Sequence, residues 1–408
     1  MNHDRAITQT YILQGHDMAT LKVAVQAVGG EITHELGIIN AMGVRLSDAE
    51  LRTLKEHDAV RRVYADAAVE VTGKPTKDDS STSTSNGNNN IDSTYLGRMT
   101  GAVALHQEGL TGDGVTIAVV DTGTWNDNGI VKNPNNETRL LAEYDATTDS
   151  SSVADGYGHG SHVTSIAVNS RLTDNGEFGG IAPMADVVTV RAFDDLGRGT
   201  YANVIRALDW VVANKDTYNI RVLNLSFGTE PRSYYWDDPM NQAVMAAWQA
   251  GIVVVASAGN TGPEAMTIGA PGNVPYVITV GAMTDNYTPD ILYDDFLATF
   301  SSAGPTVEGF VKPDLVAPGG HARGLMHTNV YLAVTYPEFH DGAKYFMMSG
   351  TSQATAVVSG IAALLLQDEP WLTPDEVKGR LMSSARPASY GSDSLAYSVL
   401  QQGAGLVN

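Results

Sequence analysis

The chain has 408 residues, of which 43% are hydrophobic and 7% aromatic, so it can bury a large core in more than one folded unit. Acidic residues number 46 against 25 lysines and arginines, and the formal net charge is −21. This charge argues against a nucleic-acid partner, because nucleic-acid binding needs clustered basic side chains. The sequence contains no cysteine, which excludes disulfides, thiolate catalysis and cysteine-ligated zinc.

No apolar stretch reaches the length of a membrane span, and no signal-peptide pattern follows Met1. We therefore expect no membrane partner and no targeting segment within this sequence. The acidic residues are explained most simply as a solvated surface, and cation binding stays open as an alternative.

Residues 1–72 are predicted to form a small first domain. Strands are predicted at residues 9–13, 32–36, 41–46 and 60–71. Asp17 is the expected cap of a helix after the first strand, and Ser47 with Glu50 makes a capping box before a second helix. The resulting order β-α-β-β-α-β indicates a ferredoxin-like α+β unit.

Residues 73–93 break this pattern, because they are rich in Ser, Thr, Asn and Asp and show no hydrophobic periodicity. Such a composition predicts a disordered linker. A linker of this kind is also a natural site of proteolysis.

Residues 94–408 are predicted to form one large α/β domain. Nearly continuous apolar strands are predicted at 115–120, 187–190, 221–225, 252–256 and 277–280. Helical patterns lie between them, for example at 202–214 and 240–250. This alternation indicates a parallel sheet with helices on both faces, in which functional side chains collect at the carboxyl ends of the strands.

Ser352 is the first candidate for chemistry. It follows a small, flexible turn and precedes a long apolar run, which predicts that it lies at the start of a buried helix. A hydroxyl in this position could attack a carbonyl, and the helix terminus would favour the resulting negative charge. The alternative is that Ser352 is simply a helix N-cap.

Three more polar residues stand at the ends of predicted elements. Asp121 ends an apolar strand, His159 lies between two glycines, and Asn260 follows another buried strand. The Asp-Thr-Gly tripeptide at Asp121 also matches pepsin-like proteases, which need a second such carboxylate that is absent here. His159 and His162 could share a metal, but no glutamate accompanies them as in zincins, and His162 is predicted to pack in the core.

In this chain order and glycine-rich setting, the four residues resemble those of the subtilisin-like serine proteases, the subtilases. The resemblance covers most of the chain. It rests on separated segments in the same order, at residues 119–123, 159–163, 180–183, 224–228, 259–260, 312–319 and 349–352.

The resemblance implies a serine endopeptidase of class EC 3.4.21 that works through an acyl-enzyme. Ser352 would be the nucleophile and His159 its general base, with Asp121 orienting the imidazole. Asn260 and the Ser352 backbone N–H would form the oxyanion hole.

A substrate cleft is implied in the same way. One edge would pair with substrate backbone as an added strand, through Gly197, Arg198 and Gly199. The pocket for the side chain before the scissile bond would have as walls Leu225, Ser226, Phe227, Gly228, Ala256, Ser257 and Ala258.

The resemblance also gives the first domain a role, as a propeptide that chaperones and inhibits the enzyme. The enzyme would cut its own chain after Val71, near Thr72, or in the linker up to about Asn90. A secreted, monomeric enzyme acting on polypeptides is expected, with no cofactor in catalysis.

The sequence departs from the family pattern at two places, with Gln353 where Met is usual and Ala356 where Pro is usual. Structural calcium is considered at Asp174, Asn175 or Glu177, where many relatives carry a calcium loop. Two other functions stay open: a non-catalytic binding protein on the same fold, and a serine esterase or peptide ligase.

Overall fold

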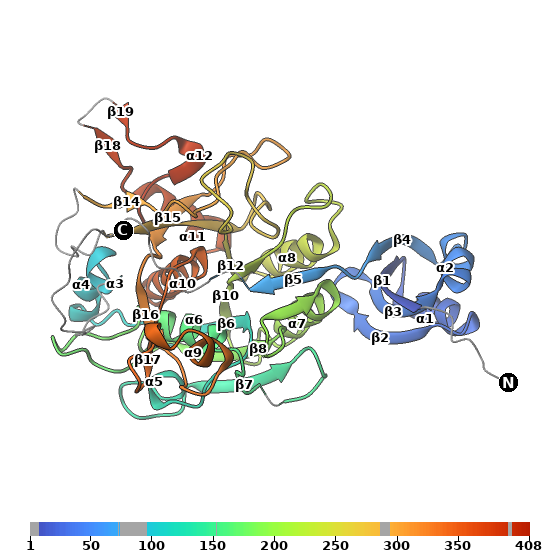
Figure 1. Cartoon of the computed structure of the whole chain (residues 1–408), viewed down its shortest axis with the longest axis horizontal. Helices are drawn as coiled ribbons and strands as arrows, with labels where there is room; N and C mark the ends of the chain where they lie inside the picture. The colour runs from blue at the N-terminus through green and yellow to red at the C-terminus, as the bar shows by residue number, and fades with distance from the viewer. Residues whose placement is uncertain (1–7, 72, 74–95, 152, 286–293, 391–393) are drawn as a thin grey trace.

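The computed structural model describes residues 8–71, 73, 96–151, 153–285, 294–390 and 394–408. The chain forms a small N-terminal lobe and a large lobe, and the strand β5 reaches from the first into the second (Figure 1). In the described part of the chain, no helix is both long and apolar enough to cross a bilayer.

The N-terminal lobe is a four-stranded antiparallel sheet in the order β2-β3-β1-β4, packed against two helices. Its elements are β1 (Thr8–Gly15), α1 (Met18–Ala27), β2 (Glu31–Leu36), β3 (Ala41–Ser47), α2 (Asp48–Lys55) and β4 (Val60–Ala65). Both predicted caps are present. Asp17 Oδ1 accepts from the Thr20 backbone N–H at 2.8 Å, and Ser47 with Glu50 forms the reciprocal capping box. The predicted ferredoxin-like order is therefore confirmed.

The prediction of one closing strand over residues 60–71 is wrong, because the chain breaks at Asp66 and Ala67. β4 ends at Ala65, and β5 (Ala68–Val71) leaves the lobe. The break is held by the large lobe: Asp66 Oδ1 accepts from the Ala202 N–H at 2.9 Å, and the Ala67 carbonyl accepts from the Tyr201 N–H at 2.9 Å.

The large lobe is built on an eight-stranded sheet in the order β14-β13-β12-β10-β6-β8-β7, with β15 also paired to β13. The strands are β6 (Thr116–Asp121), β7 (Leu140–Asp145), β8 (Asp186–Arg191), β10 (Ile220–Leu225), β12 (Val253–Ser257), β13 (Ile278–Thr284), β14 (Phe296–Leu297) and β15 (Leu315–Pro318). All pairings are parallel except that of β14 with β13. The predicted parallel sheet is confirmed. β7 was not predicted, since this edge strand alternates between half-buried and exposed residues instead of being continuously apolar.

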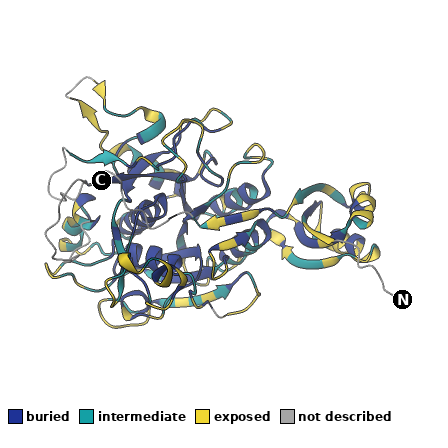
Figure 2. Ribbon diagram, in the orientation of Figure 1, coloured by how far each residue is buried: buried dark blue, intermediate teal, exposed yellow. Residues whose placement is uncertain are grey.

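Helices cover both faces of this sheet (Figure 1). On one side lie α7 (Tyr201–Ala213) and α8 (Pro239–Gln249), and on the other α6 (His159–Val168) and α10 (Thr351–Asp368). Figure 2 shows the central strands and α10 as the most buried part of the molecule. The remaining helices are α3 (Leu96–Met99), α4 (Ala102–Gln107), α5 (Asn128–Val131), α9 (Tyr331–Thr335), α11 (Pro374–Ser384) and α12 (Val399–Gln402).

The remaining strands are short. β9 (Arg198–Thr200) and β11 (Phe227–Gly228) flank β5, so these three strands form an antiparallel sheet that joins the N-terminal segment to the large lobe. Two hairpin pairs complete the fold, namely β16 (Ala322–Leu325) with β17 (Tyr345–Met348) and β18 (Ser389–Tyr390) with β19 (Ser394–Leu395).

The N-terminal lobe docks on α7 and α8 of the large lobe. The Gly37 backbone N–H donates to Asp209 Oδ2 at 2.7 Å, and His34 Nε2 lies 2.9 Å from Asn203 Oδ1. Gln14 Nε2 donates to Gln242 Oε1 at 2.8 Å, and Arg62 forms an ion pair with Asp237. These polar contacts fix the lobe at the point where β5 enters the sheet with β9 and β11.

Candidate active site

Asp121 and His159 come from separate elements and meet in a fully buried contact. Asp121 is the last residue of β6, and His159 is the first residue of α6. His159 Nδ1 lies 2.7 Å from Asp121 Oδ1, and both side chains are 0% exposed. Because a carboxylate accepts, Nδ1 of His159 carries the proton, and Nε2 is the nitrogen that can act as a base. Asp121 Oδ1 also accepts from the Thr122 backbone N–H at 2.8 Å, whereas Asp121 Oδ2 has no hydrogen-bond partner among the described residues.

The turn that presents His159 is organised by Asp155, a residue that the sequence did not single out. Asp155 Oδ1 accepts from Thr122 Oγ1 at 2.8 Å and from the Gly158 N–H at 2.7 Å. Its Oδ2 accepts from the Ser161 N–H at 2.8 Å and from Ser161 Oγ at 2.6 Å. One carboxylate thus ties the loop after β6 to the first turn of α6. Its signal in the sequence was an aspartate four residues before the histidine, which reads equally as a helix cap.

Ser352 lies in the first turn of α10 and is fully buried. Its Oγ lies 3.1 Å from the Ser226 carbonyl oxygen, and Ser226 Oγ donates to the Ser352 carbonyl at 3.0 Å. This reciprocal pair joins the start of α10 to the segment after β10. The backbone N–H groups of a first helical turn have no acceptor within the helix, so they suit a negatively charged ligand.

Asn260 is oriented by the same turn. Its Oδ1 accepts from the Thr351 backbone N–H and from Thr351 Oγ1, both at 2.9 Å. The amide nitrogen therefore points the other way, and lies 3.2 Å from the position that a Cβ would take at Gly350. A donor so placed can reach an oxyanion formed next to Ser352.

The chain itself passes through this site at Gly73. A Cβ at Gly73 would lie 3.3 Å from His159 Nε2 and 3.4 Å from Met348 Cε, and Gly73 Cα lies 3.3 Å from the Cβ position of Gly350. The main chain at residue 73 therefore passes between the imidazole and the turn that carries Ser352.

Residues predicted to bind substrate backbone are the ones that pair with β5. The Gly197 carbonyl accepts from the Val71 N–H at 3.1 Å, and β9 pairs with β5 through Arg198 and Gly199. On the other edge, Phe227 and Gly228 of β11 pair with β5. The structure therefore brings these predicted residues together along one extended segment.

A cavity of about 340 Å³ lies beside Asn260, where the side chain before the scissile bond is expected. Of the predicted wall residues only Gly228 lines it. The others are buried and do not line it, namely Leu225, Ser226, Phe227, Ala256, Ser257 and Ala258. Ser257 Oγ donates to the Phe227 carbonyl at 3.1 Å and so braces that wall. The lining that the sequence analysis did not predict comes from Thr261 and from residues 229–231 and 266–269, which lie in loops without a periodic pattern.

The residues considered for calcium do not make a cation site. Glu177 is held by Arg98, with Arg98 Nε 2.9 Å from Glu177 Oε1. Asp174 and Asn175 are exposed in a tight turn in which the Thr173 N–H donates to the Glu177 carbonyl at 2.7 Å. In the described part of the chain, no group of three or more His, Asp or Glu residues is arranged to hold a metal ion.

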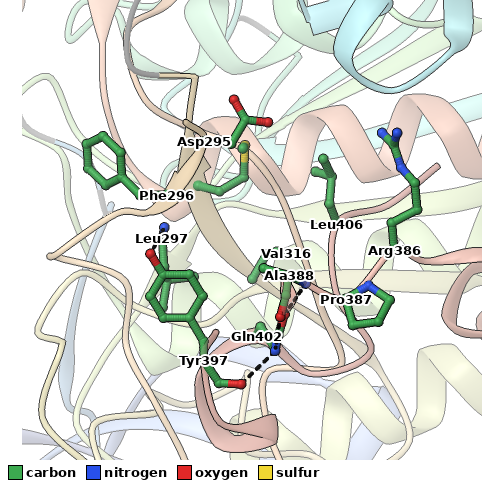
Figure 3. A pocket seen from close by; sticks show the side chains of 11 residues that line it. Asp295, Phe296, Leu297, Val316, Arg386, Pro387, Ala388, Tyr397, Gln402 and Leu406 are labelled. Atoms are coloured by element: carbon green, nitrogen blue, oxygen red, sulfur yellow. Dashed lines mark hydrogen bonds between the residues drawn. The ribbon is translucent and has the colours of Figure 1, made fainter. Parts of the chain in front are cut away.

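A second pocket lies away from this chemistry, between β13, β15 and the C-terminal segment (Figure 3). It is lined mainly by apolar side chains, together with Asp295 and Arg386. Gln402 crosses its floor, where its Nε2 donates to the Tyr397 carbonyl at 2.6 Å. The pocket contains none of the four candidate catalytic residues.

Comparison with known proteins finds relatives in sequence and in fold. The sequence model of the subtilase family, Peptidase S8, matches residues 112–405. The serine protease AprX of Bacillus subtilis (strain 168) is 41% identical over 281 residues, which is 68% of this chain and 62% of AprX. Subtilisin E of the same organism is 30% identical over 394 residues, 96% of this chain and 85% of that protein.

A solved structure has the same fold. The crystal structure of fervidolysin from Fervidobacterium pennivorans, described as a keratinolytic enzyme related to subtilisin, aligns with a TM-score of 0.75 at 22% identity. The alignment covers 100% of this chain and 61% of that one. The match to the family model covers well over half of the sequence. The chain therefore belongs to the subtilase family of serine proteases.

Proposed function

We propose that this chain is a serine endopeptidase whose triad is Ser352, His159 and Asp121. The observation that carries the proposal is the position of the chain's own backbone at residue 73. It lies against His159 Nε2 and the Gly350 turn, where a peptide substrate would have to lie. The extended pairing of β5 with β9 and β11 supports a polypeptide substrate.

The proposed reaction uses each group as the geometry allows. His159 Nε2 takes the proton of Ser352 Oγ as this oxygen attacks the peptide carbonyl carbon. The resulting oxyanion accepts from Asn260 Nδ2 and from the Ser352 N–H. When the C–N bond breaks, His159 returns the proton to the leaving amine, and water then hydrolyses the acyl-enzyme. Asp121 stabilises the imidazolium in both steps.

We further propose that residues 1–72 are an inhibitory propeptide and that residues 94–408 are the catalytic domain. Because β5 occupies both backbone-pairing edges of the cleft, it excludes other substrates. Gly73 is the one described residue of the proposed linker 73–93, and Thr72 and the segment up to Asn90 lie outside the described residues. The contact of Gly73 with His159 favours cleavage between residues 72 and 73. A secreted, monomeric enzyme without a catalytic cofactor fits this proposal.

Two full-length proteins test the proposal, the wild type and Ser352→Ala. We expect the wild type to react with a fluorophosphonate at Ser352, to digest casein, and to give a fragment whose N-terminus is Gly73 or lies close after it. Ser352→Ala should do none of these. Labelling without proteolysis would instead favour an esterase or ligase, and no labelling after removal of the N-terminal lobe would favour a binding protein. Cleavage that persists in Ser352→Ala would refute self-processing.

A further inference from the structure

The residue after the nucleophile joins the two helices of the active site. Gln353 lies in α10 directly after Ser352 and is fully buried. Its Nε2 lies 3.4 Å from Nδ1 of His162, which is in α6 three residues after His159. This contact is a hydrogen bond between the helix of the proposed nucleophile and the helix of the proposed base.

The direction of this hydrogen bond follows from the other side of the imidazole. His162 Nε2 lies 3.0 Å from the Phe346 carbonyl oxygen, which can only accept, so Nε2 carries the ring proton. Burial lowers the pKa of His162 to about 3, which keeps the ring neutral and leaves a lone pair on Nδ1. Only a donor can face that lone pair, and the Gln353 amide NH₂ is the donor.

The ring of His162 is held by the backbone of both strands of the hairpin, because Ala322 of β16 interacts with it as well as Phe346. A Cβ at Gly324 in β16 would lie 2.7 Å from His162 Cδ2, so the backbone of β16 packs directly on the imidazole. Phe346 belongs to β17, the strand that leads into the turn before Ser352. His162 therefore connects α6, α10 and the β16–β17 hairpin.

This orientation of the Gln353 amide leaves its oxygen without a hydrogen bond in the described part of the chain. Its Oε1 is buried without a hydrogen-bond partner among the described residues, although an unpaired buried acceptor is unfavourable. The opposite orientation of the amide would point Oε1 at the lone pair of His162 Nδ1. Oε1 instead lies beside the active-site turn, 2.8 Å from the Cβ position of Gly350. The contact with His162 thus decides how the amide lies.

We propose that Gln353 is a positioning residue that, through His162, fixes α10 against α6 and so aligns Ser352 with His159. This inference rests on the proposed protease function. A methionine could fill the same volume but could not donate to His162. Alignment of this kind acts on the chemical step, because small displacements of a nucleophile from its base reduce the turnover rate strongly.

Gln353→Met tests the proposal in the full-length, processed enzyme, with a peptide substrate. Active sites are counted by fluorophosphonate titration, so that misfolded molecules do not enter the rate. We expect kcat per titrated site to fall roughly tenfold while KM changes less than twofold. The matched control is Thr355→Val, since Thr355 is equally buried in α10 but donates within its own helix, to the Thr351 carbonyl at 2.7 Å. It should lower thermal stability and leave kcat unchanged.

Gln353→Glu provides a second test, based on the pH dependence of kcat, which would not change if Gln353 only filled space. A glutamic acid can donate to His162 Nδ1 only while its carboxyl group is protonated, so the ratio of variant to wild-type kcat should fall as pH rises. An unchanged kcat in Gln353→Met, or a ratio for Gln353→Glu that does not vary with pH, would overturn the inference. Absence of labelling and proteolysis in the wild type would instead refute the proposed function itself.

Discussion

The contact of His34 with α7 predicts that acid weakens the docking of the N-terminal lobe. His34 Nε2 donates to Asn203 Oδ1 at 2.9 Å, and the ring is half-buried between the lobes. Burial, helped by the charge of Arg206, lowers the pKa of His34 from 6.5 to about 4. The docked state therefore prefers the neutral imidazole, whereas a released lobe would bind a proton near pH 6.5.

The size of the effect follows from the difference between these two pKa values. The contribution of His34 to the docking equilibrium constant is fully present above pH 6.5 and is lost as the pH falls toward 4. Between these two limits the docking equilibrium constant changes by about 300-fold. By the same relation, docking at pH 5 is about 30-fold weaker than at pH 8. Because solvent screens the charge of a half-buried ring, we expect a weakening of roughly 10-fold. Burial raises the pKa values of Asp66 and Asp209 in the same interface, so these carboxylates act in the opposite direction.

A comparison with His34→Gln isolates the histidine, because glutamine can still donate to Asn203 but does not titrate. The processed complex is diluted into buffers from pH 5 to pH 8, and the lag before hydrolysis of a fluorogenic peptide is measured relative to the final rate. We expect the wild-type lag to shorten roughly tenfold more between pH 8 and pH 5 than the variant lag. The contributions of Asp66 and Asp209 cancel in this comparison. Equal pH dependence of the two lags would refute the reasoning.

Three further substitutions test the site and its support. Asn260→Ala should lower kcat by about 10²–10³ with little change in KM, as measured by steady-state kinetics, because it removes an oxyanion donor. Gly350→Ala should lower kcat by roughly tenfold or more at nearly unchanged melting temperature, since its methyl group would lie 2.8 Å from Gln353 Oε1 and 3.2 Å from Asn260 Nδ2. Arg139→Met should lower the free energy of unfolding by about 3–5 kcal/mol in urea titrations of the Ser352→Ala protein, because the buried guanidinium donates to the carbonyls of Gly129, Ile130 and Pro183. The Gly129 carbonyl would keep the Ser170 N–H as a donor, whereas the other two would lose their side-chain donor.

The central sheet and the four candidate residues were predictable because their signals are local. A strand buried on both faces is a continuous apolar run, and Asp121 and Asn260 come just after such runs. Parallel strands place their carboxyl ends at one edge of the sheet, so residues that follow different strands collect there, and the resemblance to subtilases singled out the set of four.

The features that the sequence did not reveal depend on contacts between distant segments. The strand breaks after Ala65 because the large lobe binds the next two residues. The Ala202 N–H donates to the side chain of Asp66, 136 residues earlier in the chain, and the Tyr201 N–H donates to the Ala67 carbonyl. Asp155 looks like an ordinary helix cap until Thr122 is brought beside it. The edge strand β7 lacks the apolar run that identified its neighbours. In each case the local sequence was compatible with several backbone conformations, and contacts with distant segments of the chain selected one of them.

The two attachments of the N-terminal lobe imply that cutting the chain and releasing the inhibitor are separate events. Cleavage beside Gly73 would leave the pairing of β5 with β9 and β11 intact, because those bonds lie on the N-terminal side of the cut. The contacts on α7 and α8 would also survive, since none involves residue 73. Inhibition should therefore outlast cleavage. The rate of activation would then be set at the docking surface, where His34 lies, and not by Ser352.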